Sequence, residues 1–264
     1  MKNNKKNQKN KKNDKKEEPV EKRAKQTNYI WFYVPNLIGY LRLILMSISF
    51  FSFQKHPVLT VTSYFFSYLL DYADGFTARL FNQCSMFGAV LDMVTDRSTS
   101  CGLLMVVGTL YPKYTSFFTL TSALDICSHW MQMYASLVDH KTSHKKIDSN
   151  QNILLRIYYG SRLFMGTLIV GTETFGNALY LNRFSNQLIQ KYPFLDFSSF
   201  VPSFTFYSFK INNIFAFLSA VTFPLFLIKQ IVHVVQFFSA ASKIIEKDLD
   251  AKIKERELKE KKKN

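Results

Sequence analysis

Cysteines and acidic residues are both scarce in this chain of 264 residues. The three cysteines, Cys84, Cys101 and Cys127, are an odd number inside apolar stretches, which argues against a disulfide-stabilised scaffold. Only 19 Asp and Glu residues oppose 34 Lys and Arg residues, giving a formal net charge of +15. The excess is concentrated near the two ends, whereas the long middle is a series of apolar runs. That middle argues against both a soluble globular enzyme and a disordered protein.

Residues 1–28 contain no aromatic side chain and consist mostly of Lys, Asn, Gln and Glu. Such a segment buries too little apolar area to offset its ordering entropy, so we predict a disordered basic tail. It lacks the apolar core of a signal peptide. Its lysine runs could contact anionic lipid or simply form a solvated flank. We expect no nucleic-acid partner, because no folded basic module follows the tail.

Six stretches are long and apolar enough to be membrane-spanning helices, which need about 20 residues each. They cover approximately residues 33–54, 57–80, 86–110, 114–138, 153–180 and 210–238. They are too long for the strands of a membrane barrel, which have about 10 residues. We therefore predict an all-α polytopic membrane protein with a bundle of six transmembrane helices. Residues 29–241 would form this membrane domain.

The basic residues in the connections predict the orientation of the bundle. Lys141, Lys145 and Lys146 follow the fourth span, on the same side as both ends of an even-numbered bundle. We therefore expect both termini to be cytoplasmic, and the aromatic-rich segment 183–207 to lie at the opposite interface. Residues 242–264 would form a charged tail, beginning as a short, frayed helix. Its last four residues resemble a dilysine retrieval signal of the endoplasmic reticulum.

Four aspartates lie inside the second and third apolar runs, where a carboxylate is costly. Asp71 and Asp74 share one helical face with the small residues Gly75 and Ala78, and Asp92 and Asp96 share a face with Gly88. Small residues let membrane helices approach closely. We therefore expect these two helices to pack directly and bring the four carboxylates into one cluster.

Clustered carboxylates need a compensating charge, and oxygen-only ligands suit Mg²⁺ or Mn²⁺. Two such ions could clamp a diphosphate, and Arg79 could neutralise phosphate oxygens. An ion-pair network of the aspartates with Arg79 and Arg97 is one alternative, although two arginines leave charge unpaired. A cation-transport pathway is another, although the sequence shows no repeat or broken helix of the transporter type.

The run from Asp71 to Asp96 has the spacing D-x2-D-G-x2-A-R-x8-G-x3-D-x3-D. It resembles, at all eight fixed positions, the signature of the CDP-alcohol phosphatidyltransferase family. Looser motifs resemble the eukaryotic phosphatidylinositol synthase branch of that family. They are found at residues 34–42, 91–97, 125–130, 143–145 and 155–162.

The resemblance implies transfer of the phosphatidyl group from CDP-diacylglycerol to myo-inositol, with release of CMP. By the same resemblance, Asp71, Asp74 and Asp92 would hold one metal ion, and Asp71, Asp92 and Asp96 a second. Asp96 would also be the general base. The head of CDP-diacylglycerol would contact the residues Gly75, Arg79 and Ser85. Ser85 could instead cap the following helix.

The sequence does not determine which residues contact the acceptor alcohol. Lys145, Arg156 and Arg162 are candidates for inositol or phosphate contacts, and the Asp125–His129 pair either joins them or is satisfied internally, four residues apart. Arg42 and Asn36 could touch the active site or only hold the bundle together. Rival interpretations are a sibling enzyme using serine, glycerol phosphate or choline, and a non-catalytic membrane protein or transporter. Membrane lipid and a second copy of the chain, as a homodimer, are the other expected partners.

Overall fold

The computed structural model describes residues 29–142, 152–196, 204–206 and 209–262. The predicted basic tail 1–28 therefore lies outside the described residues. The chain is predominantly helical, as predicted, and includes one short antiparallel hairpin that pairs Phe204 with Ile211. The longer helices are α2 (Val34–Ser52), α3 (Pro57–Leu80), α4 (Met86–Leu110), α5 (Thr115–Thr142), α7 (Arg162–Arg183) and α9 (Ile214–Lys261). The short elements are η1 (Pro112–Tyr114), α6 (Ile153–Gly160), α8 (Ser185–Lys191), η2 (Pro193–Leu195), β1 (Phe204–Phe206) and β2 (Phe209–Ile211).

Proline and small polar residues set many of the helix starts. Pro57 opens α3, where its missing N–H costs no hydrogen bond and its fixed φ suits the first turn. The Ser85 side chain accepts a hydrogen bond from Gly88 N and so caps α4. Asn213 caps α9 in the same way, accepting from the N–H groups of Phe215 and Ala216. The ends of the apolar runs therefore coincide closely with the ends of α2, α3 and α4.

The fifth apolar run does not form one straight helix. It is divided into α6 and α7, whose axes are bent by 91° at Ser161. The Ser161 side chain accepts a hydrogen bond from Phe164 N, so it caps α7 and starts a new helix in a new direction. The prediction of one continuous span over 153–180 is therefore wrong, and a broken helix is present that the sequence did not indicate.

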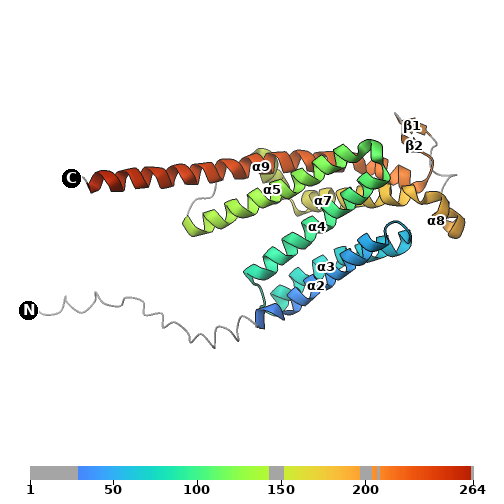
Figure 1. Cartoon of the computed structure of the whole chain (residues 1–264), viewed down its shortest axis with the longest axis horizontal. Helices are drawn as coiled ribbons and strands as arrows, with labels where there is room; N and C mark the ends of the chain where they lie inside the picture. The colour runs from blue at the N-terminus through green and yellow to red at the C-terminus, as the bar shows by residue number, and fades with distance from the viewer. Residues whose placement is uncertain (1–28, 143–151, 197–203, 207–208, 263–264) are drawn as a thin grey trace, which may run out of the picture.

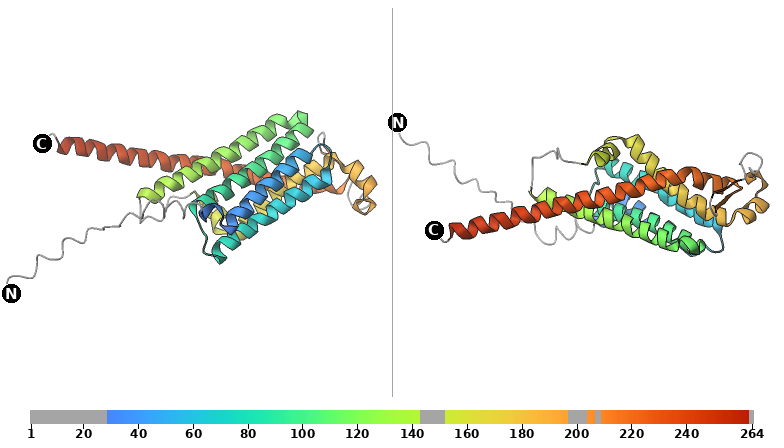
Figure 2. Two further views of the ribbon diagram at one scale, coloured as in Figure 1. Left: turned by 60° about the horizontal axis from the view of Figure 1, so that its bottom comes forward. Right: turned by 90° about the horizontal axis from the view of Figure 1, so that it is seen from above.

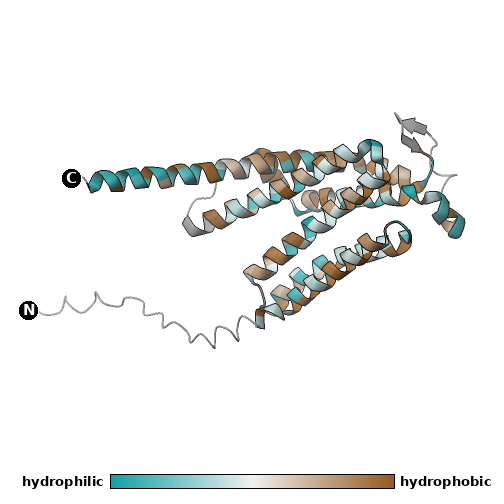
Figure 3. Ribbon diagram, viewed as in Figure 1, coloured by the Kyte–Doolittle hydropathy of each residue, from teal (hydrophilic) through white to brown (hydrophobic). Residues whose placement is uncertain are grey.

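The last helix is longer and more regular than the sequence suggested. α9 continues without interruption from Ile214 to Lys261, so the prediction of a short, frayed helix after residue 242 is wrong. Its C-terminal part extends beyond the other helices (Figures 1 and 2). Figure 3 shows that this projecting part is hydrophilic, whereas the part within the bundle is mostly hydrophobic. Opposite charges along it, such as the i,i+4 pair of Glu255 and Lys259 at 2.6 Å, support an exposed helix.

The helices form one bundle in which α4 lies between two groups of helices (Figures 1 and 2). On one side α2 packs along α3, and α2 also contacts α4. On the other side α4 packs against α5 and α7, and α9 covers both of these. The apolar core gathers around Val107, Tyr180 and Phe226, which are fully buried. One helix therefore connects the two halves of the molecule.

The surface is apolar and the interior unusually polar. Large hydrophobic side chains such as Phe51, Leu120 and Leu163 are mostly exposed, whereas Lys229 and Arg42 are buried. This distribution is that of a protein whose solvent is lipid. Within the described residues, two helices, α2 and α9, are long and apolar enough to cross a membrane, and the bent α6–α7 pair could supply a third. The structure thus has the character of an integral membrane protein, while the predicted six spans are not confirmed.

Candidate active site

The turn between α3 and α4 brings the four aspartates of the motif to one end of the bundle. Asn82 adopts a left-handed conformation with φ 53°, which Asn tolerates better than most residues. Gln83 N donates to Ala78 O at 2.9 Å and closes the end of α3. The chain then reverses into α4. As a result, the last turns of α3 and the first turns of α4 lie at the same level.

Arg42 of α2 is the centre of the acidic cluster. Its guanidinium forms ion pairs with all four aspartates, at 2.7 Å to Asp71, 2.8 Å to Asp74 and 2.9 Å to Asp92, and more closely still to Asp96. Arg42 itself is only 2% exposed. The predicted clustering of the four carboxylates is therefore confirmed. Arg42, whose role the sequence left open, belongs to the site.

The expected direct packing of the two aspartate-bearing helices is wrong. α3 and α4 barely touch, because α2 packs against both. The small residues serve α2: a Cβ on Gly39 would lie 2.9 Å from Leu91, and a Cβ on Gly88 would lie 2.9 Å from the side-chain oxygen of Asn36. The carboxylates of α3 and α4 meet because both sets point toward the same arginine.

The cluster retains the composition of a site for hard cations. One oxygen from each of Asp71, Asp74 and Asp92 lies within 4.8 Å of the others. Arg42 offers one positive charge against four carboxylates, which leaves a formal excess of three negative charges in a half-buried setting. Oxygen ligands with excess negative charge fit Mg²⁺ or Mn²⁺. These residues could therefore hold divalent ions, provided that the ions share carboxylates with Arg42.

A cavity of about 160 Å³ opens beside the cluster, between the start of α2 and the α3–α4 turn. Gly75, Arg79 and Ser85 all line it, together with Asp74 and Asp92. A Cβ on Gly75 would meet only the Arg79 guanidinium, at 3.6 Å, so Gly75 leaves this space open. No carboxylate of the described residues forms an ion pair with Arg79, which leaves its charge available to an anion. In the alternative network of the aspartates with Arg79 and Arg97, the part of Arg79 is therefore wrong, whereas Arg97 does pair with Asp96.

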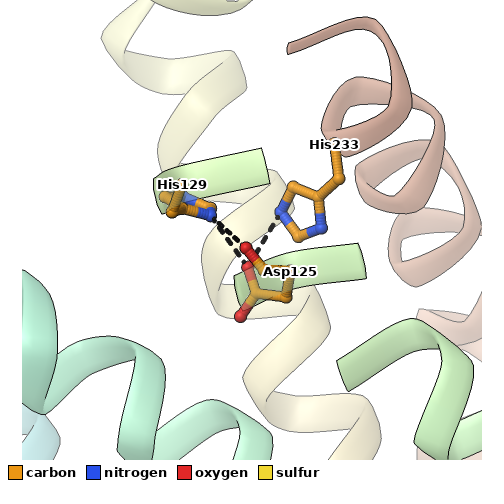
Figure 4. Close-up of side chains that lie close together, drawn as sticks. All are labelled: Asp125, His129 and His233. Carbon is orange, nitrogen blue, oxygen red and sulfur yellow. Dashed lines mark hydrogen bonds and ion pairs between the residues drawn. The ribbon is translucent and has the colours of Figure 1, made fainter. Parts of the chain in front are cut away.

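A second polar cluster lies on the other side of α4. Arg97 Nη1 lies 2.9 Å from Asp125 Oδ1, and Arg97 Nη2 lies 3.7 Å from Asp96 Oδ2. His129 Nδ1 lies 3.0 Å from Asp125 Oδ1, so the interpretation that Asp125 and His129 satisfy each other is confirmed. Figure 4 shows that His233 of α9 also faces the Asp125 carboxylate, with Nε2 at 3.4 Å. Arg97 thus connects this cluster to the aspartates.

Three residues of this second cluster were missed in the sequence: Glu173 of α7, and Lys229 and His233 of α9. Each is a single ionisable residue inside an apolar run, and that feature alone marks it as a candidate for function. Arg156 and Arg162, by contrast, are exposed and line neither cavity. Lys145 lies outside the described residues.

Comparison with known proteins supports the motif-based resemblance. The family model of CDP-alcohol phosphatidyltransferase matches residues 32–175. A relative from Schizosaccharomyces pombe, named CDP-diacylglycerol–inositol 3-phosphatidyltransferase, is 37% identical over 230 residues, covering 87% of this chain and 95% of that protein. The proteins of the same name from Candida albicans and Homo sapiens are each 46% identical, over 63% and 59% of this chain and 73% of either protein. No solved structure matches the chain. The matched region contains the whole aspartate cluster and the cavity beside it, and the chain therefore belongs to the CDP-alcohol phosphatidyltransferase family.

Proposed function

We propose that this chain transfers the phosphatidyl group of CDP-diacylglycerol to myo-inositol and releases CMP. The observation that carries this proposal is the convergence of four aspartates next to a cavity with an unpaired arginine, in a chain whose relatives are named for this reaction. A membrane-embedded diphosphate substrate needs such an anion site beside a lipid-facing surface. The exposed apolar side chains supply that surface.

Asp71, Asp74 and Asp92 would hold one divalent ion, and Asp71, Asp92 and Asp96 the other. Such ions, when bound, polarise the diphosphate and stabilise the negative charge of the leaving group. Mg²⁺ and Mn²⁺ both fit the oxygen donors. Arg42 orients all four carboxylates and offsets part of their mutual repulsion.

Arg79 and Gly75 would bind the head of CDP-diacylglycerol. The Arg79 guanidinium faces the cavity and pairs with phosphate oxygens, while Gly75 lets the nucleotide approach the backbone. Ser85 already caps α4 through its hydroxyl oxygen, yet the same hydroxyl has a proton to donate to an anion. Both roles considered for Ser85 are therefore compatible.

Asp96 would accept the proton of the attacking inositol hydroxyl, which then displaces CMP at the phosphorus that bears diacylglycerol. Asp96 is the aspartate that also lies next to Arg97, and so faces the second polar cluster. Among the four aspartates, Asp96 is therefore the one that lies toward the second polar cluster.

In the membrane, α2, α3, α4, α5, the α6–α7 pair and α9 would form six spans. In this arrangement both termini and the aspartate cluster would lie on the cytoplasmic side of the endoplasmic reticulum. The described start of α2, the α3–α4 turn and the end of α9 lie toward the same end of the molecule (Figure 1). Residues 29–241 would be the catalytic domain, with charged tails at 1–28 and 242–264, and two copies would form a homodimer.

An acceptor assay tests the proposed reaction. Purified protein in lipid vesicles, given CDP-diacylglycerol and Mg²⁺, should incorporate radiolabelled inositol into lipid but not serine, choline or glycerol 3-phosphate. Incorporation of another acceptor in preference to inositol would identify a sibling activity, and release of no CMP would refute catalysis.

Asp96→Asn is the sharpest variant for the mechanism. The amide keeps the shape of the side chain but cannot accept the proton, so turnover should fall by at least a hundredfold. CDP-diacylglycerol binding, measured by calorimetry, should largely survive because the other three aspartates remain. A variant with nearly normal turnover would rule out Asp96 as the base.

A further inference from the structure

The second polar cluster encloses a cavity of about 100 Å³ between α4, α5, α6, α7 and α9. Arg97 and Ser100 line it from α4, one turn beyond Asp96. A helix rises 1.5 Å per residue, so Ser100 lies about 6 Å further along the axis than Asp96. Arg97 forms the wall between the two sites, because its guanidinium touches Asp96 on one side and Asp125 on the other. The cavity therefore adjoins the proposed base.

The charged side chains of this cavity balance one another. Arg97 and Lys229 supply two positive charges, and Asp125 and Glu173 supply two negative ones. A ligand with a net charge would gain no overall compensation here, and it would have to lose its hydration in a buried place. A neutral ligand with many hydroxyl groups can donate hydrogen bonds to the anionic side chains and accept them from the cationic ones.

Several polar atoms in the cavity lack hydrogen-bond partners among the described residues. Neither ring nitrogen of His233 forms a hydrogen bond, although the residue is only 3% exposed and Nε2 lies 3.4 Å from Asp125 Oδ1. Arg97 Nε and Gln230 Oε1 are unpartnered as well. Lys229, which is 5% exposed, donates one hydrogen bond at 2.5 Å to the Tyr158 hydroxyl, and no described carboxylate forms an ion pair with it. Buried polar groups are nearly always satisfied, so this set indicates a ligand.

We propose that this cavity is the binding site of the acceptor, and that it selects a neutral polyol of the size of an inositol ring. The inference rests on the proposed function, since it names the place from which the attacking hydroxyl reaches Asp96. His233 and Lys229 donate to ring hydroxyls from α9. Glu173 of α7 already accepts from Tyr64 and Ser100, and its remaining lone pairs accept from a ring hydroxyl. Glycerol 3-phosphate and choline are selected against, because each carries a net charge that this balanced cavity does not compensate.

A metal ion is the competing occupant. Ligand atoms of Asp125, His129 and His233 lie within 4.8 Å of one another, as a metal site requires. The Asp125 carboxylate, however, already accepts from Arg97 at 2.9 and 3.2 Å. A divalent ion there would lie beside the cationic side chains of Arg97 and Lys229, and these would repel it strongly at low dielectric. The geometry therefore favours the polyol.

Steady-state kinetics of two variants test the assignment. His233→Phe retains the volume of the ring but removes both nitrogens, and Glu173→Gln retains the shape but removes the charge. Each should raise the KM for myo-inositol about tenfold, the worth of one hydrogen bond to a ligand. The KM for CDP-diacylglycerol should stay within about twofold. Gln236→Leu is the matched control, since Gln236 is buried on the same helix with an unpartnered oxygen but does not line the cavity.

Folding is checked by the thermal unfolding midpoint and by CDP-diacylglycerol binding in the absence of inositol. Unchanged inositol KM in both variants, or equal rises for both substrates, would overturn the inference while leaving the proposed function intact. A rise in the control as large as that in the variants would overturn it too, as would zinc stoichiometrically bound to purified wild type and lost in His233→Phe. Absence of inositol incorporation by wild type would refute the proposed function itself.

Discussion

At the scale of single residues, Arg42 provides charge compensation for the aspartate cluster that the sequence alone assigned to metal ions. Four carboxylates with no cation would repel one another, and the sequence suggested that divalent ions supply all of the compensation. Arg42 supplies part of it from a third helix, within 3 Å of all four aspartates. The cluster is thus already organised by the protein itself, and ions would complete it rather than create it.

Replacing Arg42 with Ala should make stability depend on divalent ions. Removing one partner of a buried charge pair costs about 3–5 kcal/mol, since the remaining charges are left uncompensated. The unfolding midpoint of Arg42→Ala should therefore fall well below that of wild type in EDTA and recover in millimolar Mg²⁺, which binds only the folded cluster. Arg156→Ala, an exposed arginine on α6, serves as the control and should behave like wild type. Equal midpoints for Arg42→Ala and wild type in EDTA would contradict this account of the site.

Substitutions at Gly75 and Gly166 allow the effect of an added methyl group on substrate binding to be distinguished from its effect on helix stability. Both lie within helices, and a Cβ on Gly166 would meet nothing within 4 Å, whereas one on Gly75 would face Arg79 in the cavity. Either Gly→Ala change should leave the fold intact and gain up to about 1 kcal/mol of helix propensity. Only Gly75→Ala should weaken CDP-diacylglycerol binding, measured by calorimetry. Equal affinities for the two variants would exclude Gly75 from the nucleotide site.

At the scale of elements, the apolar runs predicted the bounds of α2, α3 and α4 because helix length in such runs follows directly from where polar and cyclic residues begin. The bend at Ser161 could not be predicted, since a single serine inside an apolar run is compatible with an uninterrupted helix. The position of α2 between α3 and α4 was missed for another reason. Small residues show that a neighbour approaches closely, but not which neighbour it is.

The projecting end of α9 should be dispensable for catalysis. Residues 251–262 are exposed, and this helical part extends beyond the bundle in Figure 1. A chain ended after Asp250 should retain inositol incorporation within about twofold of wild type, because exposed surface changes have small effects on stability. A chain ended after Ile228, which lacks Lys229 and His233, should be inactive. Loss of activity in the chain that ends after Asp250 would show that the projection takes part in the reaction or in assembly.

At the scale of the whole molecule, the second cavity could not be predicted from the sequence, whereas the aspartate cluster could. The aspartate cluster was predictable because its members lie at fixed spacings in one stretch of 26 residues. Glu173, Lys229 and His233 are isolated in separate runs, and only the packing of α7 and α9 against α4 and α5 brings them together. Their common property, charge inside an apolar stretch, identifies candidates but not partners.

The native cysteines provide a test of how the whole molecule sits in the membrane. Cys84 is exposed and lines the cavity next to the aspartates, Cys127 is exposed on α5, and Cys101 is buried. If the six-span arrangement holds, Cys84 faces the cytoplasm while Cys127 faces lipid, where a thiolate does not form readily. A membrane-impermeant maleimide should therefore label sealed, cytoplasm-out vesicles at Cys84 alone. CMP should slow the labelling by occupying the same cavity, and Cys84→Ser should abolish it. Labelling of Cys84 only after the vesicles are made permeable would show that the orientation is opposite to the proposed one, because the reagent would then have reached the cavity from the lumen.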